Sequence, residues 1–143
     1  MRLITVLSLL LLFVACSPQP RPIEYGTDLC DFCRMTIIDK QHAAELVTDK
    51  GRVYKFDAIE CQVLYLQEHQ DVDFSYFLVT DYASTEGGLL AADSCTYLIS
   101  PNLSSPMGAN LTAFADHEIA QQFQFEKTGE LYDWSSLQAQ FEK

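Results

Sequence analysis

The sequence predicts an α+β domain built from two similar strand-strand-helix-strand units packed together as one domain, followed by a short C-terminal helix. Two observations support this prediction. Apolar segments of strand length alternate with segments of helical spacing, and the second half of the chain repeats the order of the first. The chain has 143 residues, of which 48% are hydrophobic and 20% charged, so it can form one folded domain and is unlike a disordered protein.

The first unit, about residues 42–80, begins with a predicted β-hairpin. Ala43–Thr48 and Arg52–Phe56 have the length and composition of strands, and Lys50-Gly51 between them supplies a turn signal. A third apolar segment, Ser75–Thr80, predicts the strand that closes the unit.

A helix is expected between the hairpin and the third strand. Asp57, with Glu60 three residues later, has the spacing of an N-cap and capping box. Apolar residues then recur at helical spacing as far as His69. These residues are Ala58, Cys61, Leu64 and Tyr65.

The second unit, about residues 95–141, repeats this order. Thr96–Ser100 and Leu111–Phe114 correspond to the two hairpin strands, and Asp116 is expected to cap the second helix. The apolar residues of that helix are Ile119, Ala120 and Phe123. Asp133–Phe141, with Trp134 and Leu137 on one side, predicts the short final helix.

The two units differ in the connection between their first two strands. This connection is four residues long in the first unit, Asp49–Arg52, and ten in the second, Pro101–Asn110. Six additional loop residues cost about 1 kcal/mol in closure entropy, and loops commonly carry function. The longer loop contains Met107.

Residues 1–15 predict a lipoprotein signal peptide. Arg2 precedes an apolar stretch that is shorter than the roughly 20 residues of a membrane-spanning helix. Phe13-Val14-Ala15-Cys16 resembles a bacterial lipobox, in which cleavage precedes the cysteine and the sulfur carries lipid. Cys16 is therefore the predicted lipidation site.

Residues 16–24 are Pro-rich and predict an extended lipidated tether, which leaves 25–143 as the folded domain. The protein is expected on the periplasmic side of the cell envelope, lipid-anchored. Ser17 after the lipidated cysteine favours the outer membrane over the inner one.

The charge excludes one large class of partners. Asp and Glu number 20 against 9 Lys and Arg, a formal net charge of −11. A chain this acidic repels phosphate backbones, so nucleic-acid binding is not expected.

The segment Cys30-Asp31-Phe32-Cys33-Arg34-Met35 contains three sulfur atoms in six residues. A single CxxC motif occurs in thioredoxin-like redox sites, zinc sites and disulfides. The β-branched run after Met35 does not favour the helix that a thioredoxin site needs. A closed zinc site needs a second pair of ligands, whereas Cys61 and Cys95 are single.

The methionines favour copper. Thioether sulfur is a soft ligand that suits Cu(I), as thiolate does. Cys33 and Met35 are two residues apart, so in an extended segment both side chains point to the same side. Met107 stands in Ser105-Pro106-Met107-Gly108, a turn sequence that suits a presented ligand better than a core residue. The predicted metal ligands are Cys33, Met35 and Met107.

Three motifs in order resemble successive blocks of the NosL family, copper-binding lipoproteins that accompany nitrous oxide reductase. They are Cys30–Met35, Gly51–Asp57, and Ser105–Gly108 followed by Ala113-Phe114. The resemblance runs from about Cys30 to about Phe114, and the lipidated N-terminus agrees with it.

This resemblance implies a periplasmic Cu(I) carrier that delivers copper for assembly of the reductase's multicopper centre. It places the family's Cys-x-Met pair on Cys33 and Met35, and its loop methionine on Met107. Cys30 and Cys61 are possible additional ligands. The implied partners are the copper ion, the reductase or its maturation or export complex, and the membrane through the N-terminal lipid.

Two other functions remain open from the residues. Cys33, Cys61 or Cys95 could serve a thiol enzyme, but no paired acid or base accompanies them, so no enzymatic activity is expected. The four cysteines outside the leader could instead form disulfides in an envelope lipoprotein without metal. None of the three histidines lies in a Cys/Met block, so none is expected to be a primary ligand. They are His42, His69 and His117.

Overall fold

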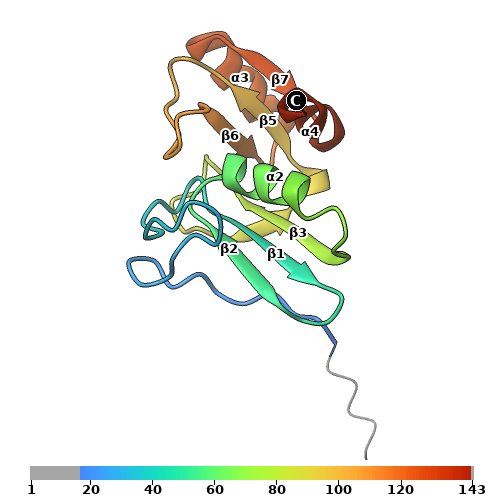
Figure 1. Ribbon diagram of the computed structural model, residues 1–143. Helices are drawn as coiled ribbons and strands as arrows, with labels where there is room; N and C mark the ends of the chain where they lie inside the picture. Colours follow the sequence, from blue (N-terminus) through green and yellow to red (C-terminus); the bar gives the residue numbers. More distant parts are fainter. Residues whose placement is uncertain (1–16, 143) are drawn as a thin grey trace, which may run out of the picture.

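The first unit forms an antiparallel sheet around a completely buried strand. The computed structural model describes residues 17–142. β1 (Ala44–Thr48) pairs with β2 (Val53–Phe56) on one side and β3 (Phe74–Thr80) on the other. A short strand, β4 (Leu89–Ala91), extends the sheet beyond β3 to give the order β2-β1-β3-β4 (Figure 1).

The second unit has the same arrangement. β5 (Thr96–Ile99) lies between β6 (Leu111–Phe114) and β7 (Glu130–Tyr132), so the sheet order is β6-β5-β7. In each unit the first strand is central and pairs antiparallel with both neighbours. The predicted fold class, two similar strand-strand-helix-strand units with a C-terminal helix, is confirmed.

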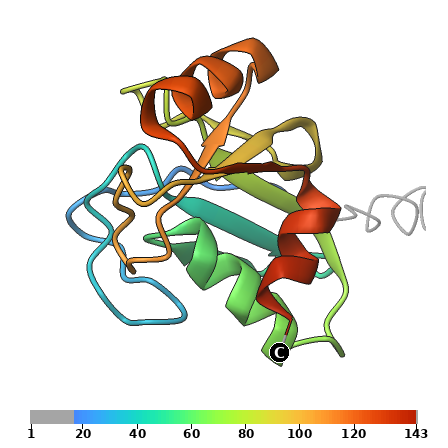
Figure 2. The ribbon, with the colours of Figure 1, turned by 90° about the horizontal axis from the view of Figure 1, so that it is seen from above.

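The helices join the two units. α2 (Ile59–Glu68) contacts β1 and β2 of its own unit and also β6 of the other. α4 (Trp134–Phe141) lies beside α2, and α3 (His117–Lys127) lies away from them against the second sheet (Figure 2).

The main hydrophobic core contains residues of both units, so they form one domain. From the first unit come Leu46, Phe56 and Ile59, and from the second come Tyr97, Leu111 and Leu137. Within the described residues, no helix is long and apolar enough to cross a membrane.

The segment that precedes β1 packs along the first sheet. The backbone N–H of Arg21 donates to Glu45 Oε1 at 2.9 Å, and Lys55 Nζ donates to the carbonyl of Pro22 at 2.7 Å. Pro18 lies against Gly51 in the β1–β2 turn. Glu45 is a central-strand residue with 0% exposure, so this covering explains why all five residues of β1 are buried.

One of the two predicted N-caps formed, and α4 has a further cap that was not predicted. Asp116 accepts the backbone N–H groups of Glu118 and Ile119 at the start of α3, and Asp133 caps α4. The capping box predicted from Asp57 and Glu60 is wrong.

Ala58 occupies the N-cap position of α2 and makes no side-chain capping bond. Asp57 and Glu60 instead bond to Cys33 and Ser105, which lie far away in the sequence.

Candidate metal centre

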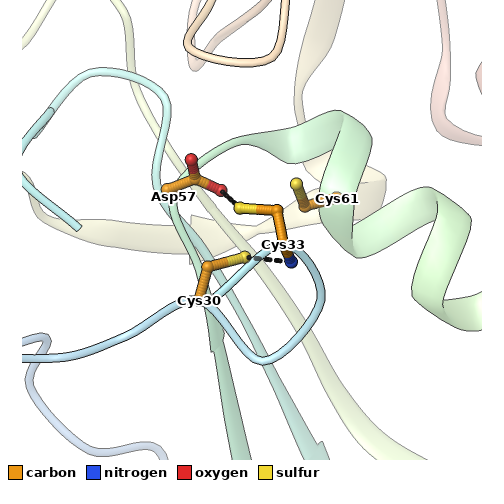
Figure 3. Close-up of side chains that lie close together, drawn as sticks. All are labelled: Cys30, Cys33, Asp57 and Cys61. Atoms are coloured by element: carbon orange, nitrogen blue, oxygen red, sulfur yellow. Dashed lines mark hydrogen bonds between the residues drawn. The ribbon is translucent and has the colours of Figure 1, made fainter. Parts of the chain in front are cut away.

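Four side chains meet where β2 ends and α2 begins. One ligand atom each from Cys30, Cys33, Asp57 and Cys61 lies within 4.8 Å of the other three. Figure 3 shows these side chains pointing toward one another from three segments of the chain. We call these four residues the thiol cluster.

A tight turn presents the two cysteines of the CxxC motif. The N–H of Cys30 donates to the carbonyl of Met35 at 2.8 Å, and the N–H of Arg34 donates to the carbonyl of Cys30 at 3.0 Å. Arg34 has a φ of 68°, in the left-handed region, which lets the chain reverse between Cys33 and Met35. The reversal brings Cys30 and Cys33 to the same side of the loop (Figure 3).

Asp31 fixes this turn to the edge of the first sheet. Its Oδ2 accepts the N–H of Lys55 at 2.8 Å, and its own N–H donates to the carbonyl of Lys55 at 2.8 Å. Lys55 lies in β2, two residues before Asp57. The turn is therefore held next to the strand end that carries the cluster's carboxylate.

The members of the thiol cluster differ in exposure. Cys30 and Cys61 are completely buried and Asp57 is 3% exposed, whereas Cys33 is partly exposed. The Cys33 thiol donates to Asp57 Oδ1 at 3.3 Å, and the Cys33 N–H donates to Cys30 Sγ at 3.5 Å. Asp57 Oδ2 is buried and has no hydrogen-bond partner among the described residues. Cys33 is thus the cysteine through which solvent or a partner reaches the cluster.

The surroundings separate the pKa values of the three thiols. The hydrogen bond with Cys61 is the main cause that lowers the pKa of Cys30 to about 6, and the backbone amides of Asp57 and Cys33 add to it. Burial raises the pKa of Cys33 to about 11. The hydrogen bond to Cys30, with burial, raises the pKa of Cys61. Without metal, the cluster at neutral pH therefore carries its thiolate on Cys30.

The structure places one predicted methionine ligand, Met35, at a cleft beside the thiol cluster, and the other, Met107, directly after Pro106 in the loop that borders this cleft. Met35 is 51% exposed and Met107 is 42% exposed. Met35 lines a cavity of about 360 Å³ together with Ser105 and Pro106 of the β5–β6 loop. Asp57 also lines this cavity, so it belongs to both the cluster and the cleft.

Glu60 anchors the loop that carries Met107. Its Oε1 accepts the Ser105 hydroxyl and, at 3.4 Å, the N–H of Ala109. The N–H of Gly108 donates to the carbonyl of Ser105 at 3.0 Å and closes a turn around Pro106 and Met107. Glu60 is 2% exposed and directly precedes Cys61 in α2. One helical turn therefore positions both a cluster thiol and the methionine loop.

The histidines and the remaining cysteine lie outside the thiol cluster. His42 Nδ1 lies 2.8 Å from Asp39 Oδ2, His69 stacks on Tyr65, and His117 contacts Thr96. Cys95 is buried and donates to the carbonyl of Ala91 at 3.5 Å. None of the cysteines of the described chain, Cys30, Cys33, Cys61 and Cys95, is in a disulfide.

Asp57 is the cluster member that the sequence reasoning missed. An Asp three residues before a Glu fits a capping box, so the local pattern predicts a helix cap here and not a metal ligand. A second signal was available, because Asp57 and Cys61 are four residues apart around a helix start, a spacing that places side chains on one side.

Comparisons with known proteins identify the family. The model of the family NosL matches residues 22–141, which is most of the chain. The protein belongs to the NosL family. No curated protein matches the sequence.

A solved structure shares the fold of this NosL protein. The crystal structure of the copper chaperone NosL from Shewanella denitrificans superposes with a TM-score of 0.71 at 19% identity. The match covers 82% of this chain and 93% of that one. Membership of the NosL family agrees with the prediction of a binding protein and not an enzyme, and together with the thiol cluster it supports copper binding.

Proposed function

We propose that this NosL protein is a Cu(I) carrier on the periplasmic side of the cell envelope. It is anchored by lipid on Cys16, in the outer membrane rather than the inner one, and supplies copper for assembly of the multicopper centre of nitrous oxide reductase. The observation that carries the proposal is the meeting of three thiols and one carboxylate within 4.8 Å, beside a cleft lined by Met35.

The chemistry of the donors supports Cu(I) as the cargo. Thiolate and thioether sulfur are soft ligands that favour Cu(I), whereas oxygen ligands favour harder ions. Every predicted ligand is a sulfur side chain, and Asp57 adds one oxygen. Cys33 is partly exposed and Met35 and Met107 lie at the surface, so a partner's ligand can reach copper held there and replace these donors one at a time.

Anaerobic titration of the reduced protein with Cu(I), against a competing chelator, tests copper binding. Tight stoichiometric binding is expected. Cys33→Ser should abolish tight binding at the exposed donors, because it removes their only thiolate. Met107→Leu conserves volume and removes the thioether, so it should weaken binding without unfolding the protein. Wild-type affinity in Met107→Leu, with loss in Cys30→Ser or Cys61→Ser, would show a pure thiolate site and exclude the loop methionine.

Delivery and anchoring need their own measurements. Copper-loaded protein incubated with copper-free reductase should lose copper to it, as measured on the separated proteins. Transfer no faster than from a small copper chelate contradicts delivery.

Cys16→Ser should release the protein from the membrane fraction, because the lipid supplies most of the membrane affinity. Unchanged fractionation without labelled lipid contradicts the anchor.

A disulfide-stabilised lipoprotein without metal is the second candidate, because three thiols lie close enough for a small movement to join two of them. Thiol counting on freshly purified mature protein separates the two functions. The carrier proposal expects free thiols on Cys30, Cys33, Cys61 and Cys95, as in the structure.

Competition between Cu(I) and Zn(II) for the same protein tests whether Asp57 makes the cluster prefer the harder ion.

A further inference from the structure

We propose that one end of the first sheet rests on the headgroups of the membrane that holds the lipid anchor. This end, which we call the base, consists of the β1–β2 turn, residues 49–52, and the α2–β3 loop, residues 69–73. The surface it contacts is a bilayer of zwitterionic phospholipids, whose headgroups carry a phosphate and an ammonium group. The inference rests on the proposed lipid on Cys16, and it adds which way the domain faces.

The path of the N-terminal segment is the first argument. Pro18 lies against Gly51 in the β1–β2 turn, and only Ser17 separates it from Cys16. The chain from Cys16 to Pro18 spans about 7 Å when it is fully extended. A lipidated cysteine stays at the membrane surface, where the headgroup layer on each side of the bilayer is about 5–8 Å thick. The turn that contacts Pro18 is therefore held within or directly against that layer.

The two loops of the base are bonded to each other. The N–H of Asp49 donates to the carbonyl of Asp73 at 3.1 Å, and the Ser75 hydroxyl donates to Asp49 Oδ1. Residues of both loops line a cleft of about 360 Å³. A membrane contact at Gly51 therefore brings the α2–β3 loop to the membrane as well.

Charge complementarity is the second argument. Lys50 and Arg52 are exposed on the base, as are Asp49, Asp71 and Asp73. These two cations and three carboxylates nearly balance, whereas the whole chain has a net charge of −11. A surface that carries both signs matches headgroups that carry both phosphate and ammonium, whereas the three carboxylates disfavour a purely anionic lipid surface.

The two cations are available to phosphate oxygens. The Arg52 guanidinium lies over the ring of Tyr54, 4.7 Å from its centre, and the Arg52 N–H donates to Thr48 Oγ1 at 3.0 Å. Within residues 17–142, neither Lys50 nor Arg52 forms a salt bridge. A guanidinium that stacks on an aromatic ring keeps the N–H groups at its edge free for hydrogen bonds to phosphate.

The metal centre lies at the other end of the same strands. β2 leads from the base to Asp57 of the thiol cluster, and its four residues advance about 13 Å. Figure 1 shows the described chain beginning beside the β1–β2 turn, with α3 at the opposite end of the molecule. With the base on the membrane, the thiol cluster is held on the side away from the bilayer, where copper partners approach without lipid in their way.

Hydrogen–deuterium exchange tests this orientation. Lipidated protein is bound to vesicles of phosphatidylethanolamine and phosphatidylcholine, and Cys16→Ser with the same vesicles is the lipid-free reference. Peptides that cover residues 49–52 and 69–73 should take up deuterium more slowly in the bound protein, and peptides of α3 should be unchanged. Lys50→Glu/Arg52→Glu should lose the protection of the base and stay in the membrane fraction, because the lipid still holds it.

A control variant makes the same change of charge away from the base. Lys40→Glu/Lys127→Glu replaces a cation before β1 and one at the end of α3, and it should keep the protection of the base. Circular dichroism checks the fold of the base variant, and Lys50→Gln/Arg52→Gln replaces it if the glutamate pair does not fold.

Vesicle-bound wild type without protection at the base overturns the orientation and leaves the anchor standing. Full protection in a folded base variant also overturns the proposed contact of its cations with the headgroups. Wild type that does not bind the vesicles contradicts the anchor and the orientation together, and copper titration of the same protein tests the carrier function independently.

Discussion

At the scale of single residues, Cys30 is the thiol of the cluster whose pKa lies below that of an ordinary cysteine. It is completely buried, yet the hydrogen bond with Cys61 and two backbone amides lower its pKa from 9.0 to about 6. A buried thiolate is stable only where donors replace the lost water, and here those donors are the Cys61 thiol and the backbone amides of Asp57 and Cys33. The metal-free protein therefore holds one ionised sulfur ready for a cation.

Titration of the reduced, metal-free protein should show one thiol ionising near pH 6. Since the folded pKa lies below the unfolded one, the unfolded chain carries the additional proton between about pH 6 and pH 9. The stability that Cys30 contributes thus rises with pH across this window and is lost as pH falls through about 6. Ultraviolet absorbance of the thiolate measures the ionisation, and chemical denaturation at several pH values measures the change in stability.

Three variants check this assignment. Cys30→Ser should remove the low-pH ionisation, and Cys61→Ala should move it upward, because it removes the hydrogen bond that is its main cause. Cys95→Ser should leave it unchanged. A low-pH ionisation that persists in Cys30→Ser assigns the thiolate to another cysteine.

The prediction that the three histidines do not bind copper can be tested by substitution. His→Ala changes at His42, His69 and His117 should leave Cu(I) affinity within about tenfold of wild type, which is about 1.4 kcal/mol in binding free energy. The same chelator competition measures it. His42 is the most informative of the three, because it is buried against Asp39, a residue that lines the cleft. A larger loss at any one position adds that imidazole to the ligand set.

At the scale of elements, the first turn of α2 organises the site. Cys61 enters the thiol cluster from this turn, and Glu60 holds Ser105 and Ala109 of the β5–β6 loop. The loop is fixed at further points, because Leu103 is buried and Ser105 Oγ accepts the N–H of Asn110 at 2.9 Å. The longer connection of the second unit is therefore an ordered part of the site.

Ser105→Ala should lower both stability and copper affinity. It leaves the buried Glu60 carboxylate and the Asn110 N–H without their partner, which costs about 1–3 kcal/mol. The loop that carries Met107 should also lose its fixed position. Denaturation curves and Cu(I) competition measure the two losses.

Ser104→Ala is the matched control. Ser104 is exposed and adjacent in the same loop, so its change in stability should stay within about 0.5 kcal/mol. Equal effects of the two substitutions would mean that Glu60 does not hold the loop.

At the scale of the whole molecule, the site joins parts that are distant in sequence. Its residues come from the segment before β1, from the β2–α2 junction and from the β5–β6 loop. A ligand that binds only the folded arrangement stabilises it by mass action. Copper should therefore tie the two units together.

Saturating Cu(I) should raise the free energy of unfolding by about 4 kcal/mol when free copper exceeds its dissociation constant a thousandfold. Thermal or chemical unfolding of reduced protein, with and without Cu(I), measures the increase. Cys33→Ser should show much less of it. An increase of equal size in Cys33→Ser would place the stabilising ion elsewhere.

Most elements could be predicted from the sequence because their signals are local. The hairpin strands, the second helix with its Asp116 cap, and the final helix each follow from periodicity and neighbouring polar residues. β4 and β7 have three residues each, too few to show a period, so their pairing is decided by the strands beside them.

The candidate site was only partly predictable, because a sequence shows local patterns and not contacts between distant residues. Spacing singled out Cys33 and Met35, and turn chemistry singled out Met107. Asp57 and Glu60 satisfy a capping pattern, but their observed partners are Cys33, 24 residues away, and Ser105, 45 residues away. These long-range bonds replaced the local cap, and a single sequence does not show them.

The docking of the N-terminal segment sets how far the domain can travel from a membrane. Pro18 lies against Gly51 and Arg21 is held on Glu45, so if Cys16 carries the proposed lipid, about two residues separate the lipid from the folded surface. Fully extended, they reach about 7 Å. The domain then searches for its copper partners laterally, in a thin layer above the lipid, and a partner must either share that membrane or come within this reach of it.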